Sequence, residues 1–156
     1  MPISVRRVTN QNIIVMSMLN PLKNGEADFK KAFKLTTAAA EPLEGRYIVI
    51  VDMARTRLSF SELVMALGVV TAERAPLFKD PDARLYIVGS GDLISLMAQA
   101  FRQTQYGKRD VPVFETLDQA ITYATLRLIR DPRGTSQRPA GRAQGTPRAR
   151  RVRTLR

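Results

Sequence analysis

The stretch RYIVIVDMARTRLSFSELVMALGVV, residues 46–70, decides the fold of this chain. It opens with an unbroken apolar run, residues 47–51, that is rich in β-branched side chains. Such a run is typical of a strand covered on both faces, as in the middle of an α/β sheet. Asp52 ends the run, and residues 59–62 then have the form of a capping box, with a hydroxyl at the N-cap and a carboxylate three residues later. The stretch therefore predicts a buried strand, a loop and a capped helix that packs back on the sheet.

Helical spacing predicts which residues of this and the other helices face the sheet. The inward residues expected of the helix after Ser59 are Phe60, Leu63, Val64, Leu67 and Val70. Those expected of a helix capped by Asp92 are Leu93, Leu96, Met97, Ala100 and Phe101. A first helix is expected over about residues 29–43 with Asp28 as its N-cap, and a last helix opens at the capping box of Thr116 and Gln119.

The remaining apolar runs complete a mixed sheet. Residues 3–8 and 13–19 predict a hairpin, residues 85–88 a second buried strand, and residues 111–114 a short strand that Pro112 confines to an edge. The predicted order is ββαβαβαβα, which favours an α/β fold with a sheet of about five strands. The sheet is expected to be mostly parallel, with an antiparallel N-terminal strand and helices packed on it.

The chain contains no cysteine and no histidine. This composition excludes thiol nucleophiles, disulfides, thiolate zinc sites and Ser-His-Asp catalysis. The carboxylates are scattered, so we expect no metal site, no cofactor and no enzymatic activity. No apolar run approaches the roughly 20 residues that span a bilayer, and no signal peptide is evident, so a cytoplasmic location is expected. The methionines at positions 16, 18, 53, 65 and 97 are interpreted as core residues.

The positive charge is concentrated at the C-terminal end. Of the net charge of +11, residues 131–156 carry +7 and residues 1–130 carry +4. We therefore expect a folded domain over residues 1–130 and a disordered basic tail over residues 131–156. The tail residues expected to bind a polyanion such as nucleic acid are Arg133, Arg138, Arg142, Arg148, Arg150, Arg151, Arg153 and Arg156. A solubilising extension that binds nothing in particular is the equal alternative.

Four polar residues are expected near the carboxyl ends of the central strands, where sites of open α/β sheets lie. Asp52 and Ser90 each follow a buried strand, and Ser59 and Ser61 stand at the start of a helix. A helix N-terminus suits an anion or a phosphorylated serine, so this rim is a candidate docking patch or phospho-switch. The alternative is that Ser59 only caps the helix, which is the usual role of serine there.

Three segments of the chain resemble the STAS superfamily, and more closely its SpoIIAA-like (STAS/SEC14-type) branch of small bacterial proteins. They are residues 5–8 of the hairpin, IVIVDMARTRLSFSELV, and FRQTQYGKRDVPVFETLDQAITYA. The resemblance implies a regulatory module like the anti-sigma-factor antagonists, in which a serine at the start of the second helix is phosphorylated by a partner kinase. Ser59 and Ser61 occupy that region, but the usual Asp-Ser-Ser-Gly run is replaced by Ser-Phe-Ser-Glu.

The leading hypothesis is a non-enzymatic STAS-like regulatory or scaffold domain that binds a protein partner through Asp52, Ser59, Ser61 and Ser90. One alternative is an adaptor that binds nucleic acid or another polyanion through the basic tail. Another is a small lipid or ligand carrier with a pocket between the sheet and the helices. The sequence leaves open whether the chain forms homo-oligomers.

Overall fold

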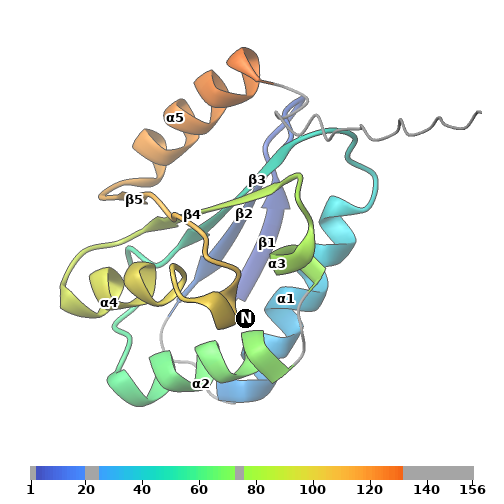
Figure 1. Ribbon diagram of the computed structural model, residues 1–156. Coiled ribbons are helices and arrows are strands. Elements are labelled where there is room, and N and C mark those ends of the chain that lie inside the picture. Colours follow the sequence, from blue (N-terminus) through green and yellow to red (C-terminus); the bar gives the residue numbers. More distant parts are fainter. Residues whose placement is uncertain (1–2, 20–24, 73–75, 132–156) are drawn as a thin grey trace, which may run out of the picture.

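The protein is an α/β domain built on one five-stranded mixed sheet (Figure 1). The computed structural model describes residues 3–19, 25–72 and 76–131. The strands are β1 (Ile3–Arg7), β2 (Ile13–Met18), β3 (Tyr47–Asp52), β4 (Ala83–Val88) and β5 (Val113–Phe114), and they follow one another across the sheet in chain order. β1 is antiparallel to β2, and the other pairs are parallel. The predicted fold class, the N-terminal hairpin and the edge position of β5 are confirmed.

The helices cover the sheet from both sides (Figure 1). On one face lie α1 (Gly25–Ala40), α2 (Phe60–Ala72), the short α3 (Pro76–Lys79) and α4 (Asp92–Ala100), which a 3₁₀ turn (Thr104–Tyr106) follows. α5 (Leu117–Arg130) lies alone on the other face. This division follows from the chain order, because right-handed crossovers between successive parallel strands place their helices on the same face.

β3 is the buried centre of the sheet, as its apolar run predicts. Val49 is fully buried in the core beneath α1, α2 and α4, and Ile48 and Ile50 are fully buried in the core beneath α5. Burying each of these side chains contributes about 1.5–3 kcal/mol relative to leaving it exposed. Ala120 and Ala124 of α5 are also fully buried, and their small side chains let this helix pack close to the strands.

Both predicted capping boxes are confirmed, and two other helix starts are wrong. α1 begins at Gly25 rather than after Asp28, which lies in the first turn, where its carboxylate favours the positive end of the helix dipole. The N-cap of α4 is Gly91, without a side-chain cap, and not Asp92. Gly91 has φ 99°, in a region that favours glycine, so the backbone of the turn selects this residue.

The prediction that Phe60, Val64 and Leu96 face the sheet is wrong, since they are 61%, 53% and 43% exposed. The reason is clearest in α2, where nearly the whole circumference is apolar. A helix that meets the sheet along one face can bury only part of such a circumference, and α2 buries Leu63 and Val70. Periodicity identified the helix, but the packing selected its inward face.

The end of α5 is tied to the start of β3. Nη1 of Arg46 lies 3.0 Å from Oδ2 of Asp131, the first residue of the predicted tail. The eight arginines that follow in the predicted tail, and its predicted disorder, lie outside the described residues. None of the helices within residues 3–19, 25–72 and 76–131 has the length and apolar character needed to cross a membrane.

Candidate interaction surface at the carboxyl ends of the strands

Asp52 and Ser90 lie at the same edge of the sheet. Asp52 is the last residue of β3 and is in register with Ser17 of β2 and Val88 of β4. Ser90 follows Val88 by two residues and is exposed. The parallel strands therefore bring the polar residues at their ends to one rim, as the sequence predicts. Asp52, Ser59, Ser61 and Ser90 are called the rim residues below.

The loop between β3 and α2 is anchored over the end of β2. Oδ1 of Asp52 accepts a hydrogen bond from the backbone N–H of Ala54 at 3.1 Å, which forms a local turn. The hydroxyl of Thr56 donates to the carbonyl of Met18 at 2.5 Å. These bonds hold the loop against the sheet and leave the side chains of Arg55 and Arg57 exposed.

Ser59 serves as the cap of α2. Its Oγ accepts a hydrogen bond from the N–H of Glu62 at 3.2 Å, and Oε2 of Glu62 accepts one from the N–H of Ser59 at 2.8 Å. A phosphate on Ser59 would break this capping box and would place its charge beside the Glu62 carboxylate. The geometry therefore favours the structural role of Ser59. Ser61 is exposed in the first turn of the same helix and carries no such constraint.

Ser90 is presented by a tight glycine turn between β4 and α4. A Cβ on Gly89 would lie 3.1 Å from Cδ1 of Ile94, so this position has little room for a side chain. Gly91 completes the turn with its positive φ. Asp92 is exposed in the first turn of α4 and would repel an anion there, so the turn is explained by backbone geometry and not by phosphate binding.

An exposed apolar stripe runs along α2 from its start, next to Ser59 and Ser61. It consists of Phe60, Val64 and Gly68, which are spaced four residues apart and so share one face of the helix. Phe60 and Val64 are the most exposed large apolar residues of α2, and a Cβ at Gly68 would have no atom within 4 Å. Sequence reasoning missed this α2 stripe because it expected both large residues to be buried. The signal that could have revealed it is the scarcity of polar residues in α2.

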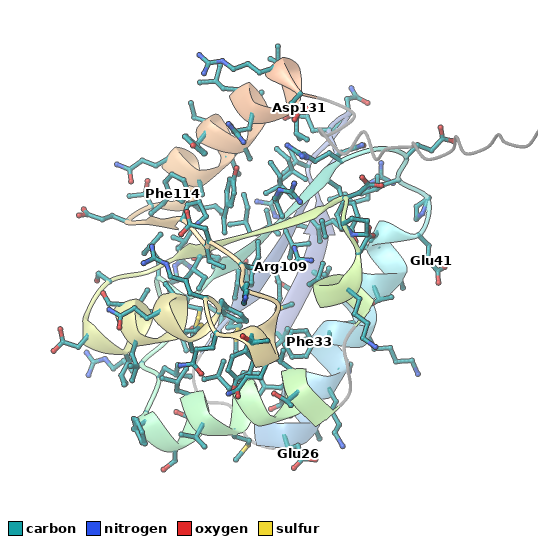
Figure 2. The ribbon with its side chains drawn as sticks, viewed as in Figure 1. Glu26, Phe33, Glu41, Arg109, Phe114 and Asp131 are labelled. Carbon is teal, nitrogen blue, oxygen red and sulfur yellow. The ribbon has the colours of Figure 1, made fainter. Side chains whose placement is uncertain are left out.

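A polar network closes the opposite edge of the sheet and has a structural role. The hydroxyl of Tyr47 donates to Oδ2 of Asp80 at 2.8 Å, and Arg109 donates to the carbonyls of Ala83 and Asp80 at 2.7 and 3.0 Å. Burial, followed by the hydrogen bond to Asp80, raises the pKa of Tyr47 well above its usual range. Burial lowers the pKa of the Arg109 guanidinium, and Asp80 partly offsets that effect. Arg109, labelled in Figure 2, lies beside the start of β4 and the turn that follows α3.

An apolar cavity of about 50 Å³ lies between the sheet and helices α1, α2 and α4. Four of its lining residues are the methionines at positions 16, 18, 53 and 97, which are buried as expected, whereas Met65 is 38% exposed. An engineered apolar cavity of about 150 Å³ is large enough for benzene. The cavity among the described residues is thus far too small for a lipid chain unless the core rearranges.

In the part of the chain that the structure describes, no three acidic residues come together as a metal site would require. No protein-family model and no curated protein matches the chain. The resemblance to the STAS superfamily therefore remains an expectation drawn from the quoted segments.

Proposed function

We propose that the chain is a non-enzymatic, cytoplasmic, STAS-like regulatory or scaffold domain that binds a protein partner through the α2 stripe and the adjoining rim residues. The observation that carries this proposal is the exposure of Phe60 and Val64, at 61% and 53%, at the start of a helix beside exposed polar groups. Protein interfaces combine an apolar, often aromatic centre with a polar margin. In this arrangement the α2 stripe supplies the centre, and Ser61 and Ser90 supply part of the margin.

The α2 stripe is suited to contact with another helix. The side chains of the stripe become smaller from Phe60 through Val64 to Gly68. The open space over Gly68 allows a partner to approach the α2 backbone closely. Exposed aromatic anchors of this kind commonly account for about 2 kcal/mol or more of binding energy. We expect Phe60 to be the main anchor of the interface.

Two features support the non-enzymatic part of the proposal. The whole chain lacks histidine and cysteine, which are the usual base and the strongest nucleophile of hydrolases. The second feature is the setting of the serines: the hydroxyl of Ser59 accepts a backbone hydrogen bond, and Ser61 and Ser90 are exposed to solvent.

Between the two serines at the start of α2, Ser61 is the better candidate for regulatory modification, because a phosphate there would leave the capping box intact.

The proposal is tested by photo-crosslinking in cells at native expression. Phe60 is replaced by the photo-crosslinker benzoylphenylalanine, and the matched control carries it at Tyr123, an aromatic residue of α5 that is 43% exposed. We expect a discrete protein adduct from position 60 and none of the same mass from position 123. Adding Val64→Asp should abolish the adduct while the melting temperature stays unchanged. Identical adducts from both positions, or an adduct that survives Val64→Asp, would contradict the proposal.

A second candidate, polyanion binding, is favoured by the exposed face of α5. Tyr123, Arg127 and Arg130 share one face of this helix at spacings of four and three residues, and all three are exposed. Because α5 leads directly into the arginine-rich tail, Arg127 and Arg130 in its last turn adjoin the tail in sequence. Basic side chains bind polyanions by releasing counterions, which makes the affinity depend steeply on salt.

This candidate is tested by titrating single-stranded nucleic acid at several salt concentrations. The chain is compared with a truncation after Asp131, which keeps the Arg46–Asp131 ion pair, and with the double variant Arg127→Gln, Arg130→Gln. We expect truncation to remove most of the salt dependence, and the double variant to lower the slope of log K against log salt by about 1.4. Unchanged slopes in both variants would sink this candidate.

A further inference from the structure

A groove lies between the β1–β2 turn and the C-terminal half of α5. It is at the amino ends of the parallel strands, opposite the rim residues. Its volume is about 390 Å³, which falls within the range of about 300–1,000 Å³ that small-molecule sites occupy. The residues that line it include Asn10, Asn12, Arg46, Thr125, Leu128 and Ile129. Figure 2 shows Asp131 at the end of α5, at this edge of the sheet.

Arg46 brings a buried positive charge to this groove. The residue is only 3% exposed, because it precedes β3 and alternates with Ile48 and Ile50 toward α5. Its Nη1 is paired with Asp131, but its Nε is buried and has no hydrogen-bond partner among the described residues. A buried donor without a partner costs about 1–3 kcal/mol, and more when it is charged. An anion that accepts from Nε would remove this cost.

The surroundings of Arg46 carry an excess of positive charge. Burial lowers the pKa of Arg84, and the nearby charges of Arg46, Arg109 and Arg127 lower it further. Asp131 acts in the opposite direction and, with the carbonyls that end α5, offsets part of this charge. At Arg84, three arginines thus act against the single carboxylate of Asp131, and Arg46 is one of these arginines, so an additional anion near Arg46 is favoured electrostatically.

The walls of the groove are held in place before any ligand binds. Nδ2 of Asn12 donates to the carbonyls of Glu44 and Arg46 at 2.8 and 3.2 Å, which fixes the turn against the start of β3. The hydroxyl of Thr125 lies 2.7 Å from Oε1 of Gln11 and so links the turn to α5. These bonds order the turn and the helix in advance, so that binding has to move only the atoms that cover Nε of Arg46.

The outer wall of the groove is apolar. Ile129 is 70% exposed, the highest value among the large apolar residues that the structure describes, and Leu128 beside it is half-buried. We propose that this groove binds a small carboxylate with a short apolar chain. Its carboxylate accepts from Arg46 Nε after the atoms that cover this nitrogen have moved aside, and its chain covers Leu128 and Ile129. The guanidinium suits a carboxylate because its N–H donors match the spacing of two oxygens. This site is separate from the α2 stripe and does not depend on the proposed protein partner.

The test is an NMR titration of the full chain with octanoate, followed at the Nε–H signals of the arginines. We expect one saturable signal, that of Arg46, to move downfield as a charge-assisted hydrogen bond forms. Octanol is the control for the apolar chain alone and should leave this signal in place. The proposal is overturned if octanoate leaves the Arg46 signal unchanged, or if octanol shifts it equally.

Two exposed residues of α5 provide matched variants that leave the buried core untouched. Ile129→Glu places a negative charge in the groove, which repels the carboxylate of octanoate, and it removes the apolar contact. It should therefore weaken octanoate binding at least about tenfold. Leu126→Glu makes the same change on the same helix at a residue that is 50% exposed and does not line the groove, and it should leave the affinity within about twofold. Equal weakening by both variants would overturn the proposal. Arg46→Met should abolish binding if it folds, and if it does not fold the Ile129→Glu comparison still decides.

Discussion

Arg46 and Asp131 are 85 residues apart in the chain, and their side chains lie 3.0 Å apart in the fold. The guanidinium is almost fully buried, whereas the side chain of Asp131 is 30% exposed. This ion pair joins the start of the central strand to the end of the helix that alone covers one face of the sheet.

Asp131→Asn should destabilise the domain by about 2–3 kcal/mol. Removing one partner of a buried pair leaves the other charge without compensation, which typically costs about 3–5 kcal/mol, and the partial exposure of Asp131 reduces this cost. Urea unfolding measures the change. The control is Asp110→Asn, which breaks the exposed pair with Arg102 and should change stability by no more than about 0.5 kcal/mol. Equal effects of the two variants would show that the Arg46–Asp131 pair has no special role.

Ser59→Ala should cost about 1 kcal/mol, because it removes the side-chain cap of α2. Ser61→Ala, two residues further on and exposed, should cost less than about 0.5 kcal/mol. Thermal unfolding of the two variants separates a capping role from a surface role for neighbouring serines. If Ser61→Ala is the more destabilising variant, the assignment of the cap to Ser59 is wrong.

Local patterns were sufficient to predict the framework of the fold. The uninterrupted β-branched run of residues 47–51 indicated a strand buried on both faces, and the structure places it at the centre of the sheet. The boxes begun by Ser59 and Thr116 were recognised because each cap involves residues only three positions apart. Such interactions depend on neighbouring residues alone, so they can be read before the tertiary structure is known.

Features that depend on distant residues were not predicted. Helical spacing cannot show which face of an apolar helix is covered, so Phe60 and Val64 were expected in the core. The pair between Arg46 and Asp131 has no local signal in either segment. One indication was present: Arg46 alternates in register with Ile48 and Ile50, so its side chain had to enter the layer beneath a helix, where a cation requires an acidic partner.

The stability should fall at alkaline pH because of Tyr47. Burial and the hydrogen bond to Asp80 raise the pKa of its phenol in the folded state above the ordinary value of about 10. The folded state therefore holds the proton more tightly, so this stabilisation is complete below pH about 10 and is lost as the pH rises through the folded-state pKa. Unfolding free energies measured between neutral and alkaline pH should decrease less steeply in Tyr47→Phe. A profile as steep as that of the unsubstituted chain would refute the assignment.

Two neighbouring positions of α2 should respond differently to truncation, because one is buried and the other is exposed. Leu63→Ala, at a residue that is 1% exposed, should cost about 2–5 kcal/mol through lost burial and a new cavity. Phe60→Ser, at a residue that is 61% exposed, should change stability by no more than about 0.5 kcal/mol. Urea unfolding of the two variants tests the orientation of the helix. A large loss from Phe60→Ser would mean that Phe60 is packed in the fold and is not available to a partner.

Two glycines with open space around them should give opposite results when replaced by alanine. In both cases an added Cβ would have no atom within 4 Å, so the outcome depends on the backbone alone. Gly91 has φ 99° and ψ 172°, a conformation that is essentially restricted to glycine, and Gly91→Ala should cost about 1–3 kcal/mol. Gly68 lies inside α2, where alanine is the better helix former, and Gly68→Ala should raise stability by about 0.5–1 kcal/mol. Calorimetry on the two variants tests the turn and the helix together. Stabilisation by Gly91→Ala would show that the turn before α4 does not require glycine.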